Sequence, residues 1–300
     1  MRGYQAGDFQ WAIRGGQALL DGENPYLAIS PAPIYPLGTP FFYPLPAAVV
    51  GFVFIFMDSY LAGALFFGLS TTLLAYGILK NGERWRLLLF LSPSFVVASY
   101  VAQWSPLLLA GAFIPIMQIF MVCKPTIGLA SFLYRPSKVG IGLAVLAGLL
   151  SLIIMPDWPF WFIGASRNQL IRHLIPLIIM PFLLLGFLSI RSREGRVFSI
   201  MTLIPQSIFF YDQLYLWLIP KSKQQMVFLT ISSWVSFGIW AAVYVWKPME
   251  VHVISALPYI IVGFFVPALM IFRWHLVQKI YCFVMSGQYR KLFSKTKRRE

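Results

Sequence analysis

Charged residues are scarce in this chain, and acidic residues are the scarcest of them. Asp, Glu, Lys and Arg make up 11% of the 300 residues, while 59% are hydrophobic and the mean hydropathy is +0.73. Soluble domains carry about 25% charged residues, so this composition excludes an ordinary soluble protein and indicates an integral membrane protein. The short alternating strands that a transmembrane barrel requires are also missing from the sequence.

Residues that form disulfides or bind metals are nearly as rare. The chain has two cysteines, Cys123 and Cys282, without a CxxC spacing, and three histidines that are scattered along the sequence. This spacing supports neither a disulfide framework nor a set of metal ligands, so we interpret both cysteines as structural. The sequence therefore predicts no metal site.

Apolar segments, in contrast, fill most of the chain, and about 20 such residues suffice to cross a bilayer as a helix. Candidate spans are residues 60–79, 87–102, 106–123, 139–155, 174–190, 197–210, 226–246 and 253–272. Prolines inside many of them predict kinked or broken helices. Residues 45–57 are short for a span and predict a re-entrant or tilted piece, and residues 214–219 are shorter still. We expect an all-α integral membrane protein, a polytopic helical bundle of about 8 to 10 segments, several broken or re-entrant.

The charges between the apolar segments predict the topology. Basic residues concentrate at 80–86, 124–138, 191–196, 221–223 and in the tail, whereas acids occur at Asp8, Asp21, Glu23, Asp157, Asp212 and Glu250. Because cytoplasmic loops are enriched in Lys and Arg, we expect the basic breaks on the cytoplasmic side and the acids outside. Three regions follow: an external acidic loop (1–43), a transmembrane bundle (44–272) and a basic cytoplasmic tail (273–300). The net charge of +14 is explained by this topology, and no nucleic-acid partner is expected.

The polar stretch GDFQWAIRGGQALLDGENPY, residues 7–26, predicts a short amphipathic helix. One face would carry Phe9, Ala12, Ile13, Gly16 and Leu20, and the other Gln10, Arg14, Gln17 and Asp21. Such a helix is expected to lie along the membrane surface. Asp8 stands where an N-cap would stand, and Gly22 and Pro25 are stop signals. Taken alone, Asp8 is open to two interpretations, a helix cap or a functional acid.

Several short motifs follow Asp8 in a fixed order. They are Gly22-Glu23-Asn24-Pro25-Tyr26, Phe41-Phe42-Tyr43-Pro44-Leu45-Pro46, Gln103 with Ser105-Pro106, Lys124-Pro125-Thr126, Asn168-Gln169-Leu170 and Tyr211-Asp212. As an ordered set, they resemble the polytopic GT-C glycosyltransferases, particularly glycosyltransferase family 87, the polyprenol-phosphate-mannose-dependent mannosyltransferase-like proteins. The family's first membrane helix has no counterpart in the seven residues ahead of Asp8, so we expect this chain to lack it.

The resemblance implies transfer of a hexose, mannose above all, from a polyprenyl-phosphate donor to a lipid or glycan hydroxyl at the external membrane face. A sugar hydroxyl is a weak nucleophile, and Asp8 is our candidate general base. Arg167, Arg172 and His173 are candidates for the donor phosphate, because guanidinium groups match phosphate geometry. Candidates for substrate binding are Asn24, Tyr26, Tyr43, Gln103, Asn168, Gln169, Tyr211 and Asp212.

Simpler interpretations stand beside these. Arg167 and Arg172 could be solvated interface residues, and Asp212 could be an ordinary external loop tip. We interpret Lys124 as a cytoplasmic boundary charge rather than a ligand. No cofactor is required by the proposed chemistry, and although an acidic site could hold a divalent cation, nothing indicates one.

Two other classes of function remain open: a transporter or lipid flippase, motivated by the broken helices, and a non-catalytic truncated relative, motivated by the missing first helix. The resemblance implies a multi-pass protein of the bacterial plasma membrane. The sugar, the acceptor and the oligomeric state do not follow from the sequence.

Overall fold

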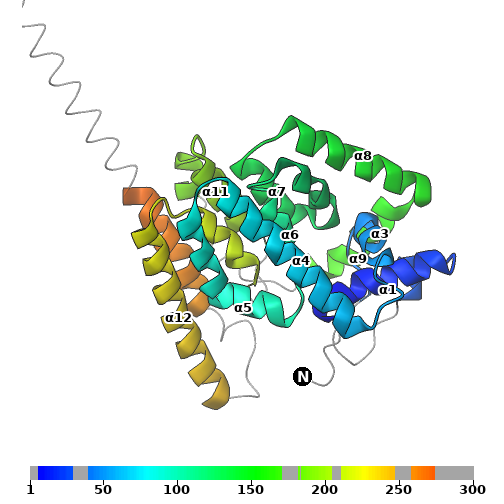
Figure 1. The fold of residues 1–300 in the computed structure, drawn as a ribbon, viewed down its shortest axis with the longest axis horizontal. Helices are drawn as coiled ribbons and strands as arrows, with labels where there is room; N and C mark the ends of the chain where they lie inside the picture. Colours follow the sequence, from blue (N-terminus) through cyan, green and yellow to red (C-terminus); the bar gives the residue numbers. More distant parts are fainter. Residues whose placement is uncertain are drawn as a thin grey trace, which may run out of the picture.

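The computed structural model describes residues 6–29, 40–170, 182, 184–204, 211–246 and 258–273, and within these ranges every regular element is a helix. The all-α prediction is therefore confirmed for this part of the chain (Figure 1). The first half contains η1 (Gly7–Phe9), α1 (Gln10–Leu20), α2 (Pro25–Ala28), α3 (Leu45–Phe52), α4 (Ser59–Lys80), η2 (Arg84–Leu91), α5 (Pro93–Tyr100), α6 (Ser105–Ala110), η3 (Pro115–Cys123) and α7 (Pro125–Tyr134). The second half contains α8 (Lys138–Ile154), α9 (Trp158–Leu170), α11 (Arg193–Leu203), η4 (Tyr211–Leu218), α12 (Lys223–Trp246) and a last helix, Pro258–Arg273. Elements labelled η are 3-10 helices.

Among the described residues, two helices are long and apolar enough to cross a membrane, namely α4 with 22 residues and the stretch Lys223–Ala242 of α12. A third candidate arises if α8 and α9, which meet at a bend of 100°, form one broken span. The predicted spans 60–79 and 226–246 are thus confirmed as single apolar helices. The larger number of spans stays a prediction.

Two other predicted spans are broken helices. Residues 87–102 are divided at Ser92, whose hydroxyl accepts a hydrogen bond from the Phe95 N–H (3.2 Å) and caps α5. Residues 106–123 are divided between α6 and η3, which begins at Pro115. Proline lacks the N–H that an interior helical position donates, so it is tolerated at the first helical turn, where both Pro93 and Pro115 stand. The prediction of broken helices is therefore confirmed in these two segments.

The N-terminal helix α1 packs against α3. A Cβ on Gly51 would lie 1.9 Å from the Ala12 carbonyl oxygen, so the two backbones touch where the helices cross. Gln10 is buried and Leu20 is 48% exposed, which reverses the faces predicted for these two residues. The apolar face of α1 therefore packs on protein rather than on lipid alone. At eight residues, or about 12 Å, α3 is too short to cross a bilayer, as expected for a re-entrant piece.

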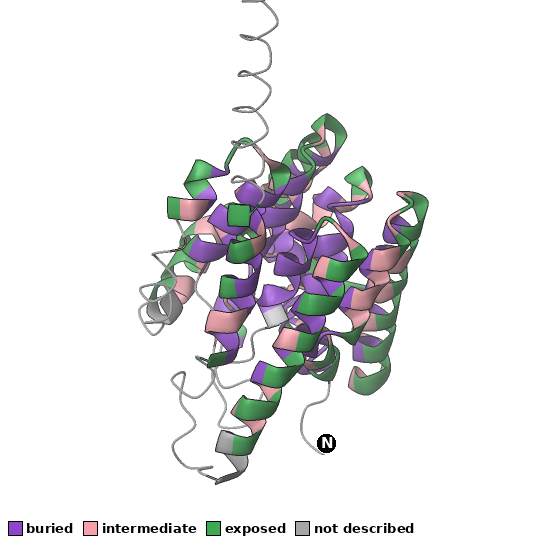
Figure 2. Ribbon diagram, turned by 90° about the vertical axis from the view of Figure 1, so that its left-hand side faces the viewer, coloured by how far each residue is buried: buried purple, intermediate pink, exposed green. Residues whose placement is uncertain are grey.

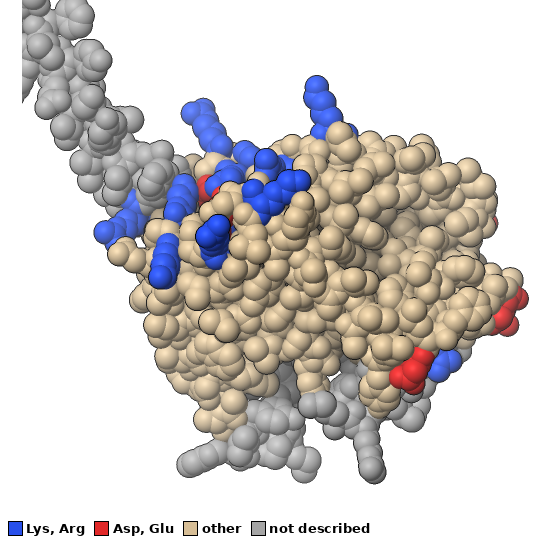
Figure 3. Space-filling model, viewed as in Figure 1, with Lys and Arg blue, Asp and Glu red and all other residues tan. Residues whose placement is uncertain are grey.

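Most of the charged residues gather by sign. Most of the visible Lys and Arg lie at one end of the molecule, and acidic residues lie at the opposite end, near α1 (Figures 1 and 3). Ion pairs join three of the predicted basic breaks, because Glu83 pairs with Arg86 and Arg193, and Glu194 pairs with Arg193 and Lys221. Between the two ends the interior is apolar, and exposed residues lie on the outer faces of the helices (Figure 2). These three breaks lie together, as the charge pattern predicts.

Candidate functional site

Asp8 is held by the connection between α5 and α6. Its backbone N–H donates to the carbonyl oxygen of Val101 (2.7 Å), and its Oδ2 atom accepts a hydrogen bond from Nε2 of Gln103. The other end of the Gln103 amide, Oε1, accepts from the Trp104 N–H (3.0 Å), and this contact turns Nε2 toward Asp8. Because Gln103 is fully buried, its amide is a fixed donor beside the carboxylate.

The capping interpretation of Asp8 is wrong. The N-cap position of α1 is Phe9, which makes no side-chain cap hydrogen bond, and Asp8 lies one residue earlier, inside η1. Gly22 does end the helix as predicted, with a φ of +73° directly after the last turn. The carboxylate of Asp8 is therefore directed to a residue 95 positions away rather than to its own helix.

The residues directly before Asp8 and Gln103 both have a positive φ. Gly7 has a φ of +56°, which glycine adopts freely, and a Cβ there would lie 2.2 Å from the Val101 carbonyl oxygen. Ala102 has a φ of +44°, which is uncommon for a residue with a side chain. A residue other than glycine in such a conformation costs about 1 to 3 kcal/mol, and such residues cluster at functional sites. The strain is therefore at Ala102, directly before Gln103.

Aromatic rings form the wall beside Asp8. Phe9 stacks on Phe66 (3.7 Å between ring centroids), and Trp104 contacts both rings edge-on at 5.6 and 5.0 Å. The Trp104 ring also lies 6.2 Å from the ring of Tyr43. Nε1 of Trp104 is buried without a hydrogen-bond partner among the residues that the structure describes. A buried unpaired donor in this wall is a candidate for a ligand or water contact.

Two residues predicted to bind substrate have structural partners. Asn24 Oδ1 accepts from the Tyr26 N–H (2.9 Å) and caps α2, and the Tyr26 hydroxyl donates to the Tyr43 carbonyl oxygen (2.8 Å). Burial raises the pKa of Tyr26, so its hydroxyl stays protonated as a donor. Asn24 therefore caps α2, and Tyr26 ties this short helix to the loop that carries Tyr43, so both residues have a structural role. Their predicted contact with substrate stays a prediction.

A second polar cluster lies on the other side of Trp104. Lys124 Nζ is 3.2 Å from Asp212 Oδ1, and the Ser105 hydroxyl donates to the same oxygen at 3.4 Å. Asp212 is only 6% exposed. An external loop tip cannot form an ion pair with a cytoplasmic boundary charge, so the two interpretations cannot both hold, and the burial of Asp212 contradicts the loop tip. The two residues meet in the interior, where ionisable groups of membrane proteins are functional candidates by default.

The remaining candidates belong to α9 or lie outside the described residues. The predicted external loop after Asp157 is a helix, α9, which contacts α2 and α3. Arg167 is exposed near its end and forms no ion pair with a described residue. Asn168 and Gln169 belong to the last turn of α9, and Tyr211 begins η4, but the described side chains exclude these three. Arg172 and His173 lie outside the described residues altogether.

A third cluster, at the basic end, was not anticipated. Arg86 is 1% exposed and donates to the carbonyl oxygens of Trp217 (3.0 Å) and Leu218 (3.2 Å) and to the Tyr134 hydroxyl (3.1 Å). The Arg86 guanidinium also donates to the carboxylate of Glu83. A guanidinium with five donors can satisfy several acceptors at once, which makes it suited to a buried position. Arg86 thus holds the C-terminal end of η4.

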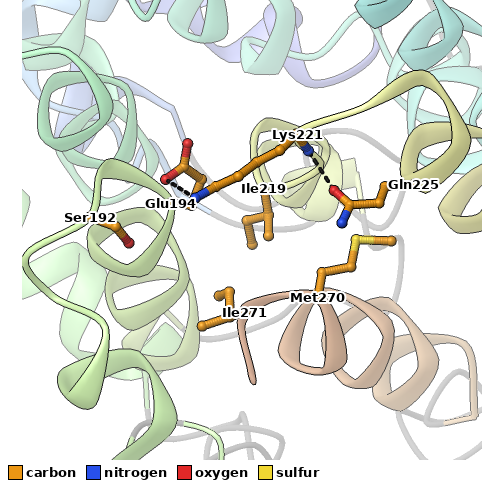
Figure 4. A pocket seen from close by; sticks show the side chains of 7 residues that line it. All are labelled: Ser192, Glu194, Ile219, Lys221, Gln225, Met270 and Ile271. Atoms are coloured by element: carbon orange, nitrogen blue, oxygen red, sulfur yellow. Dashed lines mark hydrogen bonds and ion pairs between the residues drawn. The ribbon is translucent and has the colours of Figure 1, made fainter. Parts of the chain in front are cut away.

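Glu194 continues this cluster. Burial alone would raise the pKa of its carboxyl, but the hydrogen bond from Arg193 and the nearby charge of Lys221 outweigh burial and lower it. Beside the Glu194–Lys221 pair lies a cavity of about 20 Å³, lined also by Met270 and Ile271 (Figure 4). This volume holds about one water molecule, so we do not assign the cavity to a substrate.

Comparison of the chain with known protein families, curated proteins and solved structures finds no match. Across the described ranges, no group of three His, Cys, Asp or Glu side chains is arranged to hold a metal ion. In the part of the chain that the structure describes, every regular element is a helix, and two or three helices are long and apolar enough to cross a membrane. The interior carries two neighbouring polar clusters, Asp8–Gln103 and Ser105–Lys124–Asp212.

Proposed function

We propose that this protein is a membrane glycosyltransferase that moves a hexose from a polyprenyl-phosphate donor to an acceptor hydroxyl, with Asp8 as the general base. The supporting observation is the convergence of motifs that are far apart in the sequence. Asp8 contacts Gln103, and two residues later Ser105 contacts Asp212, which pairs with Lys124. These residues comprise Asp8 and members of three of the motifs that follow it and on which the family resemblance rests, and their convergence supports a shared site.

The chemistry assigned to Asp8 requires an ionised, oriented carboxylate. As the acceptor oxygen bonds to the anomeric carbon, its proton passes to Asp8, and the bond between that carbon and the phosphate oxygen breaks with both electrons leaving on the phosphate. The Gln103 amide donates to one carboxylate oxygen, Oδ2. Oδ1 is the atom to which we assign proton transfer. Arg167, Arg172 and His173 remain the proposed phosphate ligands.

Replacing Asp8 by Asn tests the proposal, because Asn keeps the size of the side chain and loses the base. We expect transfer from polyprenyl-phosphate mannose, in membranes that contain the full chain, to fall at least about 100-fold. The matched control is Asp21→Asn, which changes a second acid at the same end of the molecule. Asp21 is exposed, and its carboxylate accepts hydrogen bonds from the side chain of Gln17, four residues earlier. Equal rates for the wild type and Asp8→Asn, with Asp21→Asn also unchanged, would exclude Asp8 as the base.

The buried Lys124–Asp212 pair favours one second candidate, a transporter or lipid flippase. Paired ionisable groups inside a membrane protein also mark ion and substrate pathways. A transporter requires the pair and not Asp8, and it moves its substrate across vesicle membranes without chemical turnover. Reconstituted protein in which Asp8→Asn retains transport while Lys124→Met loses it would establish this second function over the first.

A further inference from the structure

An open groove lies along η2, with Lys223, the first residue of α12, at its edge. Its volume is about 700 Å³, its apolar lining includes Trp85, Leu87, Leu88 and Leu91, and Arg84 and Lys223 also line it. The indole Nε1 of Trp234 donates to the Leu91 carbonyl oxygen (2.6 Å), which fixes η2 against α12. A volume of this size is typical of pockets that take small organic ligands.

The charges and the apolar lining are separated along the groove. Arg84 and Lys223 are the first residues of η2 and α12, whereas Leu91 and Trp234 meet further along the same two helices. Eight residues of 3-10 helix extend about 16 Å, and the rise of α12 from Lys223 to Trp234, eleven positions later, is similar. The two helices therefore run in parallel from a cationic end to an apolar end. The length from the cationic end to the apolar end is about half the thickness of the hydrocarbon core, or one leaflet.

The cationic end lacks compensating acids. Within the described ranges, neither Arg84 nor Lys223 has an acidic partner, and both are exposed. The nearest acid in the sequence, Glu83, is paired with Arg86 and Arg193. Arg86 also places its guanidinium 4.4 Å from the Trp85 ring centroid, which adds positive charge behind the groove. As far as the described residues show, the entrance is therefore net positive, and Arg84 and Lys223 have no acidic partner there.

We propose that this groove binds an anionic phospholipid, with its phosphate between Arg84 and Lys223 and an acyl chain along the leucines toward Leu91. Arg donates to phosphate oxygens in a fork, and Trp is favoured at the level of the lipid headgroups, where Trp85 would stand. Basic pockets between membrane helices recognise anionic headgroups in the same way. This site lies at the basic end, so it is independent of Asp8 and of the proposed sugar transfer.

Native mass spectrometry of the full chain, released from detergent with added phosphatidylglycerol or phosphatidylcholine, tests the site. We expect the first phosphatidylglycerol to bind more tightly than phosphatidylcholine. Because each basic residue near a lipid surface contributes about a fivefold preference, Arg84→Gln/Lys223→Gln should lower that preference at least about fivefold. Both side chains are exposed, so the double variant is expected to fold.

The matched control removes the same charge from the same basic end without touching the groove. Lys138→Gln/Arg191→Gln changes two exposed basic residues outside the groove lining and should leave the preference within about twofold of wild type. Leu88→Trp, which fills the groove and keeps its charges, should weaken binding of both lipids. An equal loss of preference in the two charge variants would refute the site in favour of diffuse surface attraction, and unchanged binding in Leu88→Trp would refute the acyl-chain position.

Discussion

The Lys124–Asp212 ion pair makes the sharpest prediction, because the charge pattern of the sequence separates these residues and the structure joins them. At 3.2 Å and an effective dielectric constant of about 20, their Coulomb attraction is about 5 kcal/mol. Burial of both groups opposes it, but removing one partner leaves the other charge buried and costs about 3 to 5 kcal/mol. Since the side chain of Lys124 is 17% exposed and that of Asp212 is 8% exposed, water screens part of the cost, and we expect a loss of about 3 kcal/mol for each single variant.

A double-mutant cycle measures the pair. Lys124→Met and Asp212→Asn each lower the free energy of unfolding in mixed micelles, but the double variant leaves no unpaired charge and should lose little more than either single variant. The expected coupling is about 2 kcal/mol or more. Lys138→Met combined with Asp212→Asn is the control and should be additive within about 0.5 kcal/mol. Additivity of Lys124→Met with Asp212→Asn would refute the contact and restore the assignment of the two residues to opposite sides of the membrane.

Two further predictions concern Gly7, directly before Asp8, and Glu194 at the basic end. Gly7→Ala should destabilise the protein by at least about 2 kcal/mol more than Gly22→Ala. Both glycines have a positive φ, but only a Cβ at position 7 would meet the Val101 carbonyl oxygen. Equal unfolding temperatures of the two variants in detergent would contradict this close approach. The lowered pKa of Glu194 stabilises the fold above the ordinary glutamate value of 4.5, and this stabilisation is lost as the pH falls through the lowered pKa. An acid titration of thermal unfolding should therefore show a smaller drop for Glu194→Gln than for wild type, and parallel curves would show that Glu194 makes no such contribution.

The sequence predicts the outline of the fold where local rules decide it. Composition alone gives the all-helical class, and the long apolar runs give α4 and α12 with almost their observed bounds. The Ser92-Pro93 cap and Pro115 mark breaks that the structure contains. The faces of α1 were less predictable, because its burial depends on the backbone contact with Gly51, a residue that is distant in the sequence.

The candidate site depends even more on distant residues. Asp8, Gln103 and Asp212 were found from short motifs, but their partners were not, because hydrogen bonds across 95 and 107 positions leave no periodic signal. The rule that Lys and Arg mark cytoplasmic loops treats a basic residue near a helix end as solvated. Lys124 departs from this expectation because it forms an ion pair with the buried Asp212. The burial of Arg86 could not be predicted from the sequence, since this residue stands in the same basic break as its exposed neighbour Arg84.

The two ionic clusters are linked by a pair of helices of matching length. Both α7 and η4 extend about 15 to 16 Å, and they contact each other. At one end of this helix pair, Lys124, directly before α7, forms an ion pair with Asp212 in the first turn of η4. At the other end, Arg86 donates hydrogen bonds to the last carbonyl groups of η4 and to Tyr134, the final residue of α7. A shift of η4 along α7 would break both sets of contacts together. The buried arginine at the basic end therefore fixes the register that brings Asp212 to Lys124, and the polar cluster beside Trp104 depends on a residue at the far end of η4.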